Sequence, residues 1–124
     1  MKNRVWLYCR VGNPNQLSLE GQKRHLIQFA KEHECDIVGV TAEFGSGVNY
    51  EREGLQALLS SAKSRAMDKV LVCNFSRLVR DTGLLCKCIE ELQKSDVEIV
   101  SATDGIDTSG VLKMQSCLLD HAIR

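Results

Sequence analysis

Short apolar runs alternate with longer amphipathic stretches along the chain. Strands are predicted where β-branched, aromatic and other apolar residues are concentrated, at 4–10, 36–43, 69–74 and 97–102. Helices are predicted where apolar residues recur at helical spacing, at 17–34, 53–65, 81–95 and 111–124. Ser18 is the expected N-cap of the first helix, and 103–110 is expected to be a polar loop.

This alternation predicts an α/β fold of three layers, in which helices flank a mainly parallel sheet of four or five strands. The stretch 69–74 is almost wholly apolar, which is typical of a central parallel strand covered on both faces. A chain of 124 residues is close to the commonest size of one domain.

The net charge of the chain bears on whether it binds DNA. Sixteen lysines and arginines balance sixteen aspartates and glutamates, whereas free-standing DNA-binding domains are usually basic. Contact with DNA would therefore depend on a local patch. The chain has no apolar run of about twenty residues and no secretory signal pattern, so we expect a cytoplasmic protein without a membrane partner.

The cysteines do not have the spacing of a metal site or of a disulfide framework. No C-x-x-C pair occurs among the six, which are Cys9, Cys35, Cys73, Cys86, Cys88 and Cys117. We expect reduced thiols packed as small hydrophobic side chains, with no metal and no cofactor.

Four arginines follow the predicted strands. Arg10 closes the first strand, Arg52 ends the loop after the second, and Arg77 and Arg80 come after the third. Functional groups of such sheets gather beyond the carboxyl ends of the strands. The spacing of Arg77 and Arg80 would place them on one face of a helical turn. Four converging guanidinium groups repel one another unless an anion is present, and their geometry suits phosphate oxygens.

The order of four short motifs resembles the serine site-specific recombinases, the resolvase/invertase family. The motifs span nearly the whole chain: Tyr8-Cys9-Arg10-Val11-Gly12 with Gln16 following, then Ser46-Gly47 with Arg52-Glu53-Gly54-Leu55, then Ser76-Arg77-Leu78-Val79-Arg80, and last Gly105-Ile106-Asp107-Thr108.

In that family a serine hydroxyl attacks a DNA phosphodiester, and arginines stabilise the charge that develops on the phosphate. The resemblance implies that Arg10, Arg52, Arg77 and Arg80 bind the phosphate, and that Gln16 and Ser46 support them. It also implies a resolvase-type catalytic domain at 1–110 and the start of a long interface helix at 111–124, through which copies form dimers or tetramers. Family members usually carry a separate DNA-binding region after this helix, and we expect weak DNA binding because the sequence contains none.

Two positions depart from the family pattern. Gly12 occupies the place of the nucleophilic serine and has no side chain that could form a phosphoester. Ser76 occupies an acidic position. The resemblance therefore implies a site that holds phosphate without cleaving DNA, as in a regulatory or dimerisation domain.

Two alternatives remain open. One is a recombinase that uses a displaced hydroxyl, from Ser46 or Ser76, and the other is a domain that binds a small phosphate ligand. Cys9 should point into the core because side chains alternate along a strand. We expect Glu43 to pair with an arginine. His25 and His33 should be solvated residues of the first helix.

Overall fold

One five-stranded sheet organises the computed structural model, which describes residues 3–12, 16–102 and 106–107, with only the backbone described for 16–18 and 106–107. The strands are ordered β2-β1-β3-β4-β5. Their bounds are β1 (Arg4–Val11), β2 (Asp36–Phe44), β3 (Lys69–Val72), β4 (Glu98–Ser101) and β5 (Ile106–Asp107). The first four are parallel, and β5 pairs antiparallel with β4, which confirms the mainly parallel sheet.

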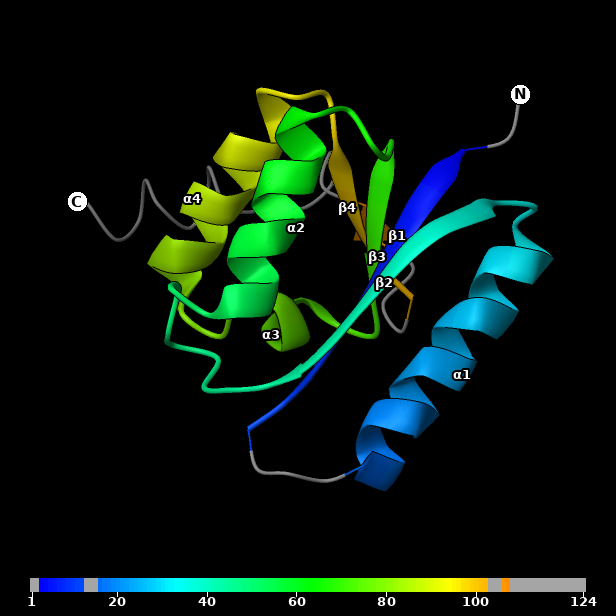
Figure 1. Cartoon of the computed structure of the whole chain (residues 1–124), viewed down its shortest axis with the longest axis horizontal. Helices are drawn as coiled ribbons and strands as arrows, with labels where there is room; N and C mark the ends of the chain where they lie inside the picture. Colours follow the sequence, from blue (N-terminus) through cyan, green and yellow to red (C-terminus); the bar gives the residue numbers. More distant parts are fainter. Residues whose placement is uncertain (1–2, 13–15, 103–105, 108–124) are drawn as a thin grey trace.

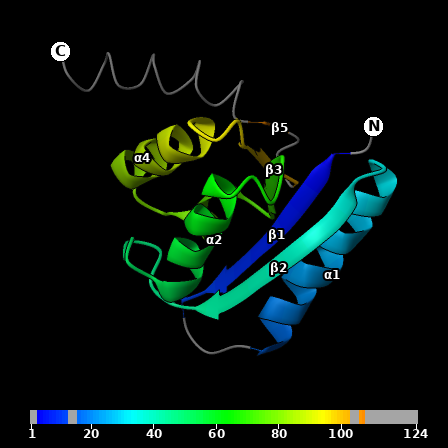
Figure 2. The same cartoon turned by 45° about the horizontal axis from the view of Figure 1, so that its top comes forward.

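Helices cover both faces of the sheet (Figures 1 and 2). α1 (Gln16–Glu32) lies on one face, and α2 (Glu53–Lys63) and α4 (Thr82–Gln93) lie on the other. The four-residue helix α3 (Phe75–Leu78) follows β3. The expected three-layer α/β architecture is therefore confirmed. No helix in the described residues is long and apolar enough to span a bilayer.

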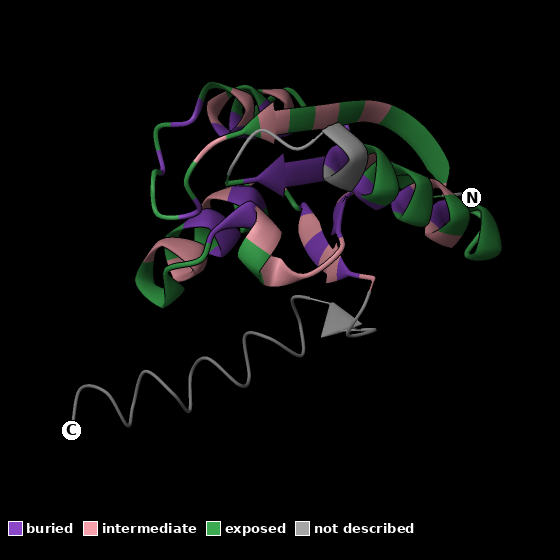
Figure 3. Ribbon diagram, turned by 90° about the horizontal axis from the view of Figure 1, so that it is seen from below, coloured by how far each residue is buried: buried purple, intermediate pink, exposed green. Residues whose placement is uncertain are grey.

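The side chains of β1 pack into two separate hydrophobic cores, one on each face of the sheet, because successive side chains of a strand point to opposite sides. Leu7 and Cys9 pack with Leu26 of α1 in one cluster, whereas Tyr8 packs with α2 and α4 in the other. Five consecutive residues of this strand, 7–11, are buried, and Figure 3 shows this buried stretch. Cys9 is fully buried, as expected, and faces away from the side on which Arg10 lies. β3 lies between β1 and β4 with three of its four residues buried, which confirms its central place.

The three long helices of the described residues end two residues earlier than the sequence pattern predicts. They end at Glu32, Lys63 and Gln93 instead of at 34, 65 and 95. Each is followed by a residue with positive φ that is not glycine: Glu34 (φ 55°), Arg65 (φ 58°) and Asp96 (φ 58°). A main-chain bond from the next residue back to the last turn closes each end, for example Cys35 N to Ala30 O at 2.8 Å. These are left-handed caps without their usual glycine signal.

Two further expectations need correction, and several others concern positions outside the described residues. α1 already begins at Gln16, so Ser18 lies in its first turn and is not the N-cap. The segment 103–110 is not a loop throughout, because Ile106 and Asp107 pair with β4. Outside the described residues lie the predicted last helix, the boundary between 1–110 and 111–124, Cys117, and Gly105 and Thr108 of the fourth motif.

The left-handed caps can be tested through stability. Glu34→Gly should raise the free energy of unfolding by about 1 kcal/mol, because glycine adopts positive φ without the steric penalty that other residues carry there. Lys31→Gly is the matched control on the same helix and should lower it by about 1 kcal/mol. Chemical denaturation measures both, and a destabilised Glu34→Gly variant would contradict the cap assignment.

Candidate phosphate site at the carboxyl edge of the sheet

Four arginines gather where β1 and β3 end. Arg10 lies near the end of β1, Arg52 directly precedes α2, Arg77 belongs to α3, and Arg80 follows it. Burial lowers the pKa of Arg10, and the positive charges of Arg52, Arg77 and Arg80 lower it further. The four groups are thus close enough to interact, as the positions of the strand ends predict.

Arg10 directs all of its guanidinium nitrogens at main-chain carbonyls. Nε donates to the carbonyl of Arg77, Nη1 to that of Gly45 and Nη2 to that of Ser76, each at 2.8 Å. Only 3% of the residue is exposed. Arg10 therefore holds the loop after β2 against the segment after β3.

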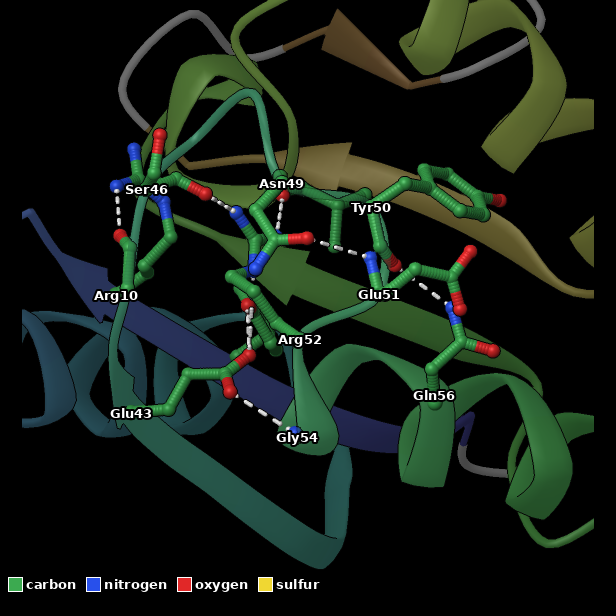
Figure 4. A network of polar contacts seen from close by, with 12 residues as sticks. Arg10, Glu43, Ser46, Asn49, Tyr50, Glu51, Arg52, Gly54 and Gln56 are labelled. Atoms are coloured by element: carbon green, nitrogen blue, oxygen red, sulfur yellow. Dashed lines mark hydrogen bonds and ion pairs between the residues drawn. The ribbon is translucent and has the colours of Figure 1, made fainter.

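Arg52 makes a second bridge between the same two segments (Figure 4). Its Nη1 donates to the carbonyl of Ser46 at 2.7 Å, and its Nη2 donates to the carbonyl of Leu78. Its Nε lies 3.5 Å from Oε2 of Glu43. The residue is 4% exposed, so this charge is also buried.

Glu43 neutralises Arg52 and is itself fully engaged, as expected of a carboxylate that pairs with an arginine. The hydroxyl of Tyr8 donates to its Oε2, and the main-chain N–H of Gly54 donates to its Oε1 at 2.9 Å. Burial, and then the hydrogen bond to Glu43, raise the pKa of Tyr8 above its usual range. Glu43 thereby ties β1 and β2 to the start of α2.

The acceptors follow a simple order along the chain. In the loop after β2, the consecutive carbonyls of 45, 46 and 47 receive N–H groups from Arg10, Arg52 and Arg80. In α3, the consecutive carbonyls of 76, 77 and 78 receive guanidinium N–H groups of Arg10 and Arg52. A four-residue helix cannot satisfy its own last carbonyls, so these acceptors are available to the arginines.

Gln22 is a site residue that the sequence analysis did not assign. Its Nε2 donates to the carbonyl of Arg10 at 2.9 Å, and its Oε1 accepts the N–H of Arg10 at 3.1 Å. It is 8% exposed, so this paired contact holds the main chain of Arg10 against α1. The available signal was the stretch Ser18-Leu19-Glu20-x-Gln22, which follows the first motif in the resemblance to the serine recombinases.

Arg77 and Arg80 do not share a helical face, contrary to the expectation. α3 ends at Leu78, and Val79 is extended with φ −147° and ψ 130°. Arg77 is partly buried, and its Nη1 donates to the carbonyl of Arg10 at 3.3 Å. Arg80 is exposed, and its main-chain N–H donates to the carbonyl of Gly47 at 2.9 Å.

Gly12 is exposed immediately after β1. Among the described residues not adjacent in the chain, a Cβ atom added there would have one neighbour within 4 Å, Nη1 of Arg10 at 3.9 Å. The position of the missing side chain is thus open and beside the arginine cluster.

The other candidate side chains have local partners. The hydroxyl of Ser76 donates to Oδ1 of Asn74, and the Oγ of Ser46 accepts the N–H of Val48 at 3.3 Å. Both serines are exposed. The side chain of Gln16 lies outside the described residues.

The histidines and cysteines stand apart from this chemistry. His25 is exposed on α1, as expected, whereas His33 is exposed but lies one residue beyond the end of that helix. Burial raises the pKa of the Cys9 thiol to about 12, which leaves it protonated near neutral pH. Within the described part of the chain, no three His, Cys, Asp or Glu side chains gather in a metal-binding arrangement.

Comparison with known proteins identifies the family. The model of the resolvase N-terminal domain matches residues 5–118. The chain belongs to this family. The N-terminal catalytic domain of TP901-1 integrase is a similar solved structure, with 26% identity, a TM-score of 0.84, and coverage of 97% of this chain and 93% of that one.

Two further relatives support the same assignment. A resolvase family site-specific recombinase from Streptococcus pneumoniae is 28% identical, with a TM-score of 0.79 and coverage of 99% of this chain and 91% of that one. The C-terminal catalytic domain of ISC1926 TnpA, an IS607-like serine recombinase, is 29% identical, with a TM-score of 0.75 and coverage of 80% and 67%. The chain is a site-specific recombinase-like domain, and resolvase-family domains act on DNA and oligomerise.

The Glu43 contacts can be tested by an isosteric change. Glu43→Gln should lower the free energy of unfolding by about 3 kcal/mol, because it leaves the buried charge of Arg52 without a counter-charge. Glu53→Gln, an exposed change at the start of α2, should stay within about 0.5 kcal/mol of the unaltered protein. Denaturant titration checks both, and equal effects of the two substitutions would refute the role given to Glu43.

Proposed function

We propose that this domain binds a backbone phosphate of DNA at the arginine site and does not form the covalent phosphoserine link. The observation that carries the proposal is Gly12, which offers no nucleophile beside Arg10. Covalent transfer needs a nucleophile within reach of phosphorus, and removal of that group leaves only binding and electrostatic effects. Ser76 in the acidic position supports the same conclusion.

The four arginines would contribute unequally to phosphate binding. Arg10 and Arg52 are buried and direct their donors at carbonyls and at Glu43. Arg77 is partly buried and Arg80 is exposed, so their guanidinium groups are the more accessible ones. We assign first contact with phosphate to Arg77 and Arg80, and support of the site to Arg10, Arg52, Gln16 and Ser46.

The role that fits such a domain is to act beside an active relative, as a regulatory or dimerising partner. Its contribution would be phosphate contact and association through 111–124, in a homodimer or tetramer. The equal numbers of acidic and basic residues favour weak DNA binding by this domain alone.

The loss of cleavage is tested by restoring the hydroxyl. The unaltered protein should give no denaturant-resistant protein–DNA adduct with duplexes of mixed sequence. Any adduct should form only with Gly12→Ser, whose new side chain lies next to Arg10 and is not crowded by the described residues. Gel electrophoresis under denaturing conditions, with labelled DNA, detects the adduct.

A robust adduct from the unaltered protein would refute the proposal and revive the displaced hydroxyl. Ser46→Ala and Ser76→Ala would then identify which serine carries the DNA. Gly12→Ala is the matched control for Gly12→Ser, since it adds the same Cβ without the hydroxyl.

The division among the arginines is tested by the salt dependence of DNA binding. Arg77→Ala and Arg80→Ala should each reduce the slope of log K against log salt by about one, as the loss of one phosphate contact does. Arg65→Ala removes an arginine whose side chain is 72% exposed beyond the end of α2, and it should leave the slope unchanged. Equal slopes for all three variants would contradict the assignment.

A further inference from the structure

Gly47 is a buried glycine in the loop that joins β2 to α2. Its φ lies outside the left-handed region, so the backbone conformation does not require glycine there. The requirement is for space. A Cβ atom at this position would overlap Cγ and Cδ of Arg80 and lie 2.9 Å from Nη2 of Arg10.

The same residue also holds the main chain of Arg80, through the 2.9 Å bond from the Arg80 N–H to the Gly47 carbonyl. Arg80 therefore contacts Gly47 in two ways, through its main-chain N–H and through the aliphatic part of its side chain. In the part of the chain that the structure describes, the Arg80 guanidinium has no hydrogen bond or ion pair of its own. The path of its stem over Gly47 is what determines where this charge lies.

Of the two side chains that crowd Gly47, only one can yield easily. Arg10 is fixed by three hydrogen bonds to carbonyls and is buried. Arg80 is exposed and follows an extended residue, so its stem can rotate away. A methyl group at position 47 would accordingly displace mainly Arg80, although Nη2 of Arg10, 2.9 Å from the new Cβ, would also have to shift slightly.

We infer that Gly47 is a positioning residue that directs the Arg80 guanidinium at the phosphate site. This inference rests on the proposed phosphate binding and adds the element that aims the most exposed of the four arginines. Gly47 itself does not touch the phosphate.

The test is a double-mutant cycle read out as DNA affinity and salt slope. Gly47→Ala should weaken binding to a short duplex about tenfold, the magnitude of one lost charge-assisted contact, and reduce the salt slope by about one. Arg80→Ala should do the same, and the double variant should be no weaker than Arg80→Ala alone. Gly21→Ala is the matched control, because a Cβ there meets nothing within 4 Å, and its slope should equal that of the unaltered protein.

The outcomes separate this inference from the proposed function. If Arg80→Ala lowers the slope and Gly47→Ala does not, Gly47 has no positioning role and the phosphate site stands. If neither substitution changes the slope, both ideas are wrong. An effect of Gly47→Ala that adds fully to that of Arg80→Ala would show that Gly47 acts by another route, which also overturns the inference.

A second measurement decides the matter if Gly47→Ala alone does not fold. Removal of the Arg80 stem frees the space that the new methyl group needs, so the Gly47→Ala/Arg80→Ala double variant should melt at a higher temperature than Gly47→Ala. Equal or lower stability of the double variant would refute the contact on which the inference depends.

Discussion

Two buried guanidinium groups join the loop after β2 to the segment after β3, and the geometry of the whole carboxyl edge depends on them. Burying a charge is unfavourable unless donors and acceptors are matched. Arg10 meets this condition with three carbonyl oxygens. Arg52 meets it in part, with two carbonyls and the charge of Glu43, because its buried Nε makes no hydrogen bond with the described residues. The acceptors exist because α3 is too short to use its own last carbonyls and because residues 45–47 lie beyond the end of β2, where their carbonyls pair with no described strand.

This arrangement limits how the site can meet a phosphate. An N–H that donates to a carbonyl cannot donate to a phosphate oxygen at the same time. Arg10 uses one N–H on each of its three guanidinium nitrogens in this way, which leaves the second N–H of each Nη. Arg10 and Arg52 are also buried, so phosphate contact by their remaining N–H groups would require movement of the segments that cover them. Arg77 and Arg80 are more exposed, so their guanidinium groups can contact a phosphate with less movement of these segments.

The alternation of strands and helices was predictable because it depends on local patterns, and so was the gathering of arginines, because parallel strands end at one edge. The helix ends were predicted two residues late because Glu34, Arg65 and Asp96 take positive φ without the glycine that normally marks such a cap. α3 was missed because four residues carry no periodicity. The burial of Arg10 and Arg52 could not be predicted, because it depends on how segments 45–47 and 76–78 pack together, about thirty residues apart in the chain.

Retained arginines in a domain without a nucleophile have two possible causes, and the structure separates them. Loss of Arg52 would leave Glu43 without its counter-charge and the carbonyls of Ser46 and Leu78 without this donor. Stability alone is therefore a reason to keep Arg52. The same holds for Arg10. Their presence therefore says little about phosphate chemistry. Arg80 is different: it is exposed, and its guanidinium makes no hydrogen bond or ion pair with the described residues, so stability gives little reason to retain it. The case that this site still recognises phosphate thus depends chiefly on Arg80, and to a lesser extent on Arg77, more than on the count of four.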